Sequence, residues 1–167
     1  MLEKIVSGGQ SGVDRAALDA AREVGLACGG WCPRDRWAED GPIAACYPLT
    51  ETPQRDPAQR TAWNVRDADA SLVLARGNPR GGTAFTVECA RAEGRPCRVV
   101  DLESGADAAQ IARWLQCSGV RVLNVAGPRE SQAPGIQLAA LALLREVLAA
   151  ALYTPRGEDP GPHGTSR

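Results

Sequence analysis

The sequence predicts an α/β domain of three layers, in which a doubly wound, mostly parallel sheet of about five strands is flanked by helices. The main observation is that short, β-like apolar runs alternate with helical patterns along the chain. In addition, 167 residues with a 44% share of hydrophobic side chains suit one compact domain with an ordinary core. We expect this single domain to span residues 1–153. Residues 154–167 are rich in glycine, proline and charge, so we expect a disordered tail there.

The expected strands are Lys4 to Ser7, Leu26 to Trp31, Ser71 to Ala75, Cys97 to Leu102 and Val120 to Ala126. The expected helices are Val13 to Val24, Pro57 to Val65, Thr83 to Ala92, Ala106 to Leu115 and Pro134 to Leu152. The first helix has an apolar face made of Val13, Ala17, Ala20 and Val24. Gly25 follows it and can adopt the left-handed conformation that ends helices.

The last expected helix opens at Pro134 and is apolar around most of its circumference. This pattern is typical of a helix buried in the core or of a subunit interface. We therefore expect a homo-oligomer, either a homodimer or a homotetramer.

The stretch from Cys32 to Pro57 differs from the rest of the chain because it has no clear periodicity. It carries Trp37 and five prolines, which are Pro33, Pro42, Pro48, Pro53 and Pro57. Its length predicts a folded functional loop or lid, with a disordered insertion as the alternative.

Composition excludes several classes of function. A net charge of −1 gives no overall attraction to nucleic acid or to an anionic membrane, and no apolar run approaches the ~20 residues of a membrane span. Lys4 is the only lysine, which excludes a P-loop lysine and argues against Schiff-base chemistry. His163 is the only histidine, which argues against histidine-based zinc sites and against Ser-His-Asp or Cys-His triads. We expect no metal site, no nucleic-acid partner and no membrane partner.

The cysteines form no CxxC pair and have no metal-ligand spacing, and no signal peptide precedes Lys4. We therefore expect reduced thiols in a cytoplasmic protein. They are Cys28, Cys32, Cys46, Cys89, Cys97 and Cys117.

A glycine-rich loop follows the first expected strand and opens the first helix. It consists of Gly8, Gly9, Gln10, Ser11 and Gly12, followed by Asp14 and Arg15. Glycines allow a sharp turn, and the first-turn amides with the positive end of the helix dipole bind anions. We expect an anion near the amides of Gly9 to Gly12, and a tight structural turn is the alternative. Asp14 would either stabilise the helix start or contact a ribose, a pterin or a metal.

Two further segments follow expected strands and should reach the same sheet edge, because the carboxyl ends of parallel strands share one side. The first offers anion and hydroxyl contacts from Gly81, Gly82, Thr83 and Thr86. The second contains Gly127, Arg129, Glu130 and Ser131. Arg129 can hold a phosphate, whereas Ser131 either caps the following helix or contacts the ligand, with capping favoured.

The short helix after Pro57 carries a fourth group of candidates. Helical spacing places Arg60, Trp63, Asn64 and Asp67 on one face, suited to stacking on a flat heterocycle and to reading its edge. The alternative is a solvated face with Trp63 in the core.

Six segments in this order resemble the molybdenum carrier family of circularly permuted YpsA-like proteins. They are SGGQSGVDRAALDAA, GWCPRDRWAEDGPI, YPLTETP, RTAWNVRDADASLVL, GGTAFT and LNVAGPRES, and the resemblance covers about Lys4 to Leu152. It implies a Rossmann-like fold akin to the lysine-decarboxylase-like and cytokinin-activating families. It also implies binding of molybdenum cofactor (molybdopterin) or of a related nucleotide-like ligand.

The wider group includes phosphoribohydrolases with the motif Gly-Gly-x-Gly-Thr-x-x-Glu. This chain keeps the two glycines and Glu88 but has Ala84 and Phe85 in place of Gly-Thr, which argues against N-glycosidase activity.

The leading functional hypothesis is a carrier that binds an anionic, phosphate-bearing small molecule and needs no cofactor for catalysis. Molybdenum cofactor or molybdate is the expected bound ligand. One alternative is a nucleoside 5′-monophosphate phosphoribohydrolase, with Glu88 as its catalytic carboxylate. A nucleotide-ligand sensor that acts through protein partners is another.

Overall fold

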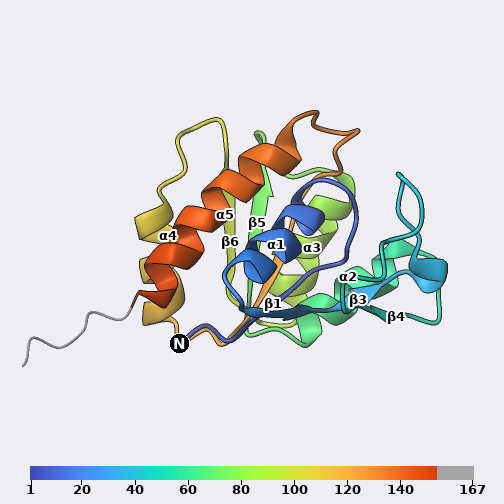
Figure 1. Cartoon of the computed structure of the whole chain (residues 1–167), viewed down its shortest axis with the longest axis horizontal. Helices are drawn as coiled ribbons and strands as arrows, with labels where there is room; N and C mark the ends of the chain where they lie inside the picture. The colour runs from blue at the N-terminus through green and yellow to red at the C-terminus, as the bar shows by residue number, and fades with distance from the viewer. Residues whose placement is uncertain (154–167) are drawn as a thin grey trace, which may run out of the picture.

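The computed structural model describes residues 1–153 (Figure 1). The expected disordered tail and His163 therefore lie outside the described residues. The strands are β1 (Lys4–Val6), β2 (Ala27–Gly29), β3 (Trp31–Cys32), β4 (Thr50–Glu51), β5 (Ala70–Ala75), β6 (Cys97–Asp101) and β7 (Val122–Ala126). The helices are α1 (Val13–Glu23), α2 (Pro57–Arg66), α3 (Gly81–Ala92), α4 (Ala108–Cys117) and α5 (Ile136–Leu152), with a 3₁₀ turn at Arg34–Arg36.

The central sheet has five parallel strands in the order β2-β1-β7-β5-β6. Helices α1, α4 and α5 pack together in one layer, and α2 and α3 pack together in another (Figure 1). This arrangement confirms the predicted α/β class and the Rossmann-like fold that the resemblance implies. The buried residues of β1, β5 and β7 form the core together with the inner faces of α1, α4 and α5.

One predicted strand, Leu26 to Trp31, is divided in two. Gly30 has a φ of 122°, and a Cβ there would lie 2.6 Å from the carbonyl oxygen of Ser7. The chain turns at this glycine, so that β2 joins the central sheet and β3 pairs with β4 in a separate two-stranded sheet.

The last helix begins two residues later than predicted. Gly135 precedes it in the left-handed conformation, and the Glu130 carboxylate accepts hydrogen bonds from Gly135 N at 2.5 Å and Gln137 N at 3.0 Å. Pro134 therefore lies outside the first turn. Much of the apolar surface of α5 is buried against α1 and α4, although Leu138 is 74% exposed.

The first helix has its predicted inner face, since Val13, Ala17 and Ala20 are buried. Val24 is 43% exposed because it follows the end of α1, and Gly25 has the predicted positive φ.

The segment between β3 and α2 is folded, so the alternative of a disordered insertion is wrong. Part of it packs with Leu18 in a small second core that contains Cys32, Ala38, Ile43, Tyr47 and Leu49. The Arg36 guanidinium holds the segment together because it donates hydrogen bonds to the carbonyls of Ile43, Ala44, Tyr47 and Leu49. All six cysteines are free, as expected. No helix within residues 1–153 has the length and apolar character needed to cross a membrane.

Candidate functional site

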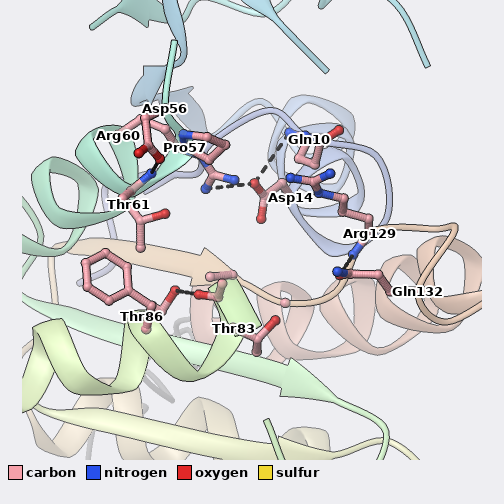
Figure 2. A pocket seen from close by; sticks show the side chains of 15 residues that line it. Gln10, Asp14, Asp56, Pro57, Arg60, Thr61, Thr83, Thr86, Arg129 and Gln132 are labelled. Carbon is pink, nitrogen blue, oxygen red and sulfur yellow. Dashed lines mark hydrogen bonds and ion pairs between the residues drawn. The ribbon is translucent and has the colours of Figure 1, made fainter. Parts of the chain in front are cut away.

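A cavity of about 330 Å³ lies at the carboxyl ends of the central strands (Figure 2). It is bordered by the loop after β1, by the first turns of α1, α2 and α3, and by the segment after β7. The lining residues are Gln10, Asp14, Asp56, Pro57, Ala58, Arg60, Thr61, Gly82, Thr83, Phe85, Thr86, Ala126, Gly127, Arg129 and Gln132. The glycine-rich loop after β1, the start of α3 and the segment after β7 were expected at one sheet edge, and all three contribute residues to this cavity.

One wall of the cavity carries a buried ion pair between Asp14 of α1 and Arg60 of α2. The Arg60 Nη1 to Asp14 Oδ2 distance is 3.2 Å, and the side chains are 12% and 3% exposed, respectively. Burial raises the pKa of Asp14, against the opposing effects of Arg60 and of the Gln10 amide, which donates to Asp14 Oδ2 at 3.4 Å. Arg60 Nε is buried and has no hydrogen-bond partner among residues 1–153. This arrangement keeps a carboxylate and a guanidinium together at the cavity wall.

Gly8 makes that ion pair possible. A Cβ on Gly8 would lie 2.1 Å from Arg60 Nη1, so only glycine lets the guanidinium lie against the loop backbone. The predicted site residue Gly8 therefore positions Arg60 through its lack of a side chain.

The opposite wall is the first turn of α3. No side chain caps this helix, and a Cβ on Gly81 or Gly82 would meet no atom within 4 Å. The Thr86 hydroxyl donates to Gly82 O at 3.1 Å, whereas no hydrogen bond of the Thr83 hydroxyl is found among the described residues. An open helix start with a free hydroxyl nearby is suited to an anion.

Arg129 reaches the cavity from the segment after β7. Its guanidinium lies 5.2 Å from the centre of the Trp37 ring. Figure 2 shows the hydrogen bond that its backbone N donates to Gln132 Oε1, at 3.2 Å. Arg129 forms no ion pair with any residue in the range 1–153. Arg129 therefore offers its positive charge to the cavity.

The glycine loop differs from the expected anion cradle, because its amides already bind the protein's own oxygens. Gln10 N donates to Asp14, Ser11 N to Gln10 Oε1 at 3.1 Å, Gly12 N to Gln137 Oε1 at 3.2 Å and Val13 N to Pro128 O at 3.3 Å. These are four consecutive amides that lead into α1. The structural alternative, a tight turn, describes this loop better.

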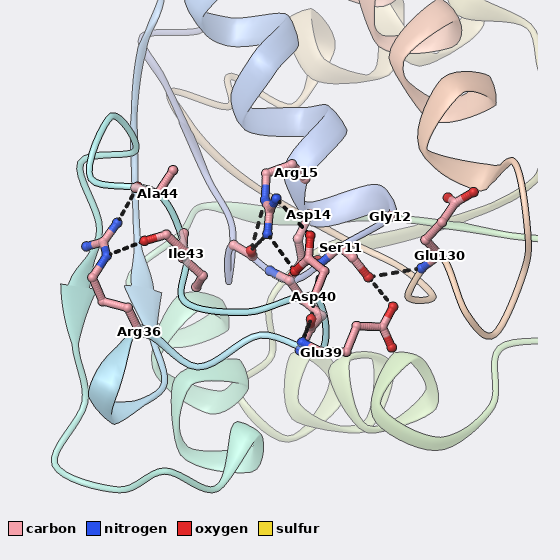
Figure 3. Close-up of polar contacts among 12 residues, drawn as sticks. Ser11, Gly12, Asp14, Arg15, Arg36, Glu39, Asp40, Ile43, Ala44 and Glu130 are labelled. Atoms are coloured by element: carbon pink, nitrogen blue, oxygen red, sulfur yellow. Dashed lines mark hydrogen bonds and ion pairs between the residues drawn. The ribbon is translucent and has the colours of Figure 1, made fainter.

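Residues 37–40, which we call the clasp, lie over the glycine loop (Figure 3). The Glu39 carboxylate accepts hydrogen bonds from the Ser11 hydroxyl and from Ser131 Oγ at 2.5 Å, and Glu39 N donates to Gln10 Oε1 at 2.9 Å. Partial burial opposes ionisation of Glu39, but the hydrogen bonds from Ser11 and Ser131 dominate and lower its pKa. The clasp thus ties the loops after β1 and β7 together.

Arg15, a predicted ligand residue, belongs to the same arrangement. Its Nη2 donates to Gly9 O at 3.1 Å and forms an ion pair with Asp40 Oδ1 at 3.3 Å. Arg15 is absent from the cavity lining, and its guanidinium anchors the clasp instead.

Glu130 and Ser131 also have structural contacts and do not line the cavity. Glu130 caps the start of α5, whereas the favoured capping role for Ser131 is wrong, because its hydroxyl binds Glu39.

The predicted recognition face of α2 is divided. Arg60 lines the cavity, but Asn64 is buried against β3, where its amide group binds both Trp31 N at 2.8 Å and Trp31 O at 2.9 Å. Trp63 packs edge-on against Trp31, and Asp67 accepts from Trp31 Nε1 at 2.8 Å. These three residues therefore hold β3 in place, away from the cavity.

Glu88 of α3 is exposed and lies outside the cavity lining, so the structure does not place the expected catalytic carboxylate at the site. Sequence reasoning missed Asp56, Thr61, Phe85 and Gln132, which line the cavity, and Glu39, which holds it together. Asp56 carried a usable signal, because an aspartate before Pro57 predicts a helix cap, and its carboxylate does accept from Ala58 N at 2.9 Å.

Comparisons with known proteins extend the resemblance seen in the sequence. Residues 5–148 match the model of the circularly permutated YpsA SLOG family. The chain is also similar to the crystal structure of a protein from Syntrophus aciditrophicus SB described as a "putative molybdenum carrier protein". The two sequences are 37% identical, the TM-score is 0.82, and the match covers 91% of this chain and 96% of that chain. No curated protein matches the chain. The family match spans nearly the whole described domain, and the chain belongs to the circularly permuted YpsA family of SLOG proteins.

Proposed function

We propose that the protein binds a small molecule carrying a phosphate or another oxyanion in the 330 Å³ cavity and acts as its carrier. The observation that carries this proposal is that Arg129, without an ion-pair partner among the described residues, and the uncapped start of α3 line one cavity. Both features favour negative charge. The anion therefore sits beside α3, in place of the predicted position at the glycine loop.

The cargo we propose is molybdate or molybdenum cofactor, following the resemblance to the molybdenum carrier. Residues 1–153 contain no group of three His, Cys, Asp or Glu side chains suited to a metal cation. Molybdenum would instead be held as an oxyanion, or as the cofactor bound through its phosphate, by N–H and O–H donors. The cavity volume falls at the lower end of the range for small-molecule sites, which suits either a bare oxyanion or a compact cofactor.

Nothing in the structure favours the phosphoribohydrolase alternative, because Glu88 is exposed and does not line the cavity. Assembly into a homodimer or homotetramer and a cytoplasmic location remain predictions.

The test is isothermal titration of the purified protein with molybdate, inorganic phosphate, AMP and molybdopterin, each in turn. We expect at least one of these probes to bind, and Arg129→Ala to weaken that binding about ten- to a hundred-fold, since a charge-assisted hydrogen bond contributes roughly 1.5–3 kcal/mol. Arg113→Ala is the matched control, because Arg113 is exposed on α4 and outside the cavity. The melting temperature of Arg129→Ala should change little, since its guanidinium forms no ion pair with any residue in the range 1–153 and its aromatic contact is with the partly exposed Trp37.

Absence of binding for all four probes would remove the carrier proposal. Unchanged affinity in a stable Arg129→Ala protein would remove Arg129 from the site and leave α3 as the anion contact.

A further inference from the structure

The outer face of α5 is exposed, yet most of its side chains are apolar. We call it the α5 face. It comprises the exposed residues of α5 and the exposed residue that follows the helix, which are Leu138, Ala142, Arg145, Glu146, Ala149 and Tyr153. Leu138 and Tyr153 are 74% and 70% exposed, respectively. A surface helix normally turns polar side chains to water, as α4 in the same layer does with Gln110, Arg113 and Gln116. The apolar character of the α5 face therefore indicates a contact surface.

The α5 face carries two charges, which are adjacent in sequence. Arg145 and Glu146 are the only charged residues of the helix. Arg145 Nε forms an ion pair with Glu23 Oε2 of α1 at 2.7 Å. Glu146 is exposed and forms no ion pair with any other residue between 1 and 153. The centre of this face therefore offers a carboxylate that can accept a second cation.

The α5 face is symmetric about its centre, which lies between Arg145 and Glu146. At 3.6 residues per turn, Ala142 and Ala149 lie close to the middle line of the face, and the two charges lie on its opposite flanks. The alanines add little bulk along this line, so a second helix can pack closely against it. A face with this pattern is suited to a copy of itself.

We propose that the α5 faces of two copies of this chain pack against each other about a two-fold axis that runs along the helices, so that the two α5 helices are parallel. Opposite flanks meet in a parallel pair, which places Arg145 of each copy beside Glu146 of the other. An antiparallel pair would bring identical flanks together, with Arg145 against Arg145 and Glu146 against Glu146. Charge complementarity therefore favours the parallel pair. In it, Arg145 bridges Glu23 of its own chain and Glu146 of the partner subunit.

This interface lies apart from the cargo cavity. Figure 1 shows α5, in orange and red, crossing the near side of the sheet in front of β5 and β6. No residue from 138 to 153 lines the 330 Å³ cavity. The inference therefore goes beyond the proposed function and can be tested without any cargo.

The first experiment measures the mass of the full chain by light scattering and its dissociation constant by sedimentation equilibrium. We expect a dimer at micromolar concentration. Ala142→Arg should raise the dissociation constant roughly a hundred-fold, because it places a bulky charge where the helices touch. Its circular dichroism spectrum should not change, since Ala142 is exposed and arginine favours helices. Ala109→Arg is the matched control, because Ala109 is an exposed alanine of α4, and it should leave the dissociation constant unchanged.

A charge exchange tests the pairing across the axis. Glu146→Arg should raise the dissociation constant roughly ten-fold, because each Arg145 then meets a like charge. The double variant Arg145→Glu with Glu146→Arg restores opposite charges across the axis, so it should recover most of this loss.

A cross-link tests the direction of the helices. Ala142→Cys should form a disulfide-linked dimer on mild oxidation, because a parallel pair places the two 142 positions opposite each other. An antiparallel pair would separate them by seven residues along the axis, roughly 10 Å, which is too far for a disulfide. The native protein is the reference, since Cys46 and Cys117 are exposed.

The possible outcomes are distinguishable. A dimer that Ala142→Arg dissociates and Ala142→Cys cross-links supports the proposal, as does a tetramer that Ala142→Arg reduces to dimers. A monomer at micromolar concentration overturns it, and so does an oligomer that Ala142→Arg leaves intact, because that oligomer uses another face. Dissociation by Ala142→Arg without cross-linking of Ala142→Cys overturns the parallel arrangement. None of these outcomes depends on whether molybdate, phosphate, AMP or molybdopterin binds.

Discussion

Two glycine-rich turns at the same sheet edge differ in what surrounds their backbone. Both follow a central strand and open a helix, the first between β1 and α1 and the second between β5 and α3. In the first turn, four consecutive amides donate to oxygens of the protein itself. In the second turn, Gly81 and Gly82 are exposed, and a Cβ on either would meet no atom within 4 Å. No side chain caps the helix that follows.

The difference shows that glycine content alone does not identify an anion site. The first turn needs glycine for close packing, since a Cβ on Gly12 would lie 2.3 Å from Pro128 O. The second turn has space around its glycines and can admit a ligand. A strand-to-helix glycine turn is an anion site only where its amides remain free.

The sharpest test of this comparison substitutes one glycine in each turn. Gly12→Ala should destabilise the protein by about 4 kcal/mol or more, because the new Cβ meets backbone atoms and the φ of 82° is unfavourable for alanine. Gly82→Ala should change stability by less than about 1 kcal/mol, because open space surrounds the site and alanine favours helices. Denaturant unfolding measures both. Similar losses for the two variants would contradict the proposed difference between the turns.

Two carboxyls beside the first turn, Asp14 and Glu39, should give pH dependences of opposite sign. The folded-state pKa of Asp14 is raised by burial, so its stabilising contribution is present below the unfolded value of 3.8 and is lost as pH rises through the folded pKa. The pKa of Glu39 is lowered, so its contribution is present above the unfolded value of 4.5 and is lost as pH falls through the folded pKa.

Unfolding free energies of the native protein, Asp14→Asn and Glu39→Gln between about pH 3 and 7 would measure these contributions. Relative to Asp14→Asn, the native protein should lose stability as pH rises. Relative to Glu39→Gln, it should gain stability as pH rises. Parallel curves for all three proteins would show that neither carboxyl is perturbed by its surroundings.

The smallest expected effect concerns the contact between Trp37 and Arg129. Trp37→Ala should reduce stability by only about 0.5–1 kcal/mol, because it removes an arginine-aromatic contact at a partly exposed position. Ligand affinity should fall several-fold, since Arg129 loses the surface that orients it. Trp114→Ala removes a comparable contact with Arg98 far from the cavity and should leave binding unchanged. An equal loss of affinity in both variants would exclude an orienting role for Trp37.

The alternation of apolar runs and helical patterns was sufficient to predict the five parallel strands of the central sheet and all five helices. It could not predict the division at Gly30, because that turn is imposed by contact with Ser7, which is distant in sequence. The two-residue strand β4 is also too short to have a periodic pattern.

The prediction of site residues succeeded for side chains that carry hydrogen-bond donors and make few contacts within the protein. Arg129 and Thr83 follow strands, carry donors and do line the cavity. Arg15, Asn64 and Glu130 carry equally suitable groups, but they bind backbone or side-chain atoms that only the folded chain brings near. Sequence patterns show which groups can bind a ligand, and tertiary contacts decide which of them are left free.

The position of β7 between β1 and β5 sets an order of events during protein synthesis. Ser7 and Val125 are hydrogen-bonded across a separation of 118 residues, so β1 lacks its inner neighbour until β7 leaves the ribosome. At about 5–20 residues per second, this delay is on the order of ten seconds. During that time the pairing edge of β1 is open to other chains. Arg129 is made after β7, so the proposed anion site is complete only once nearly the entire domain has been translated.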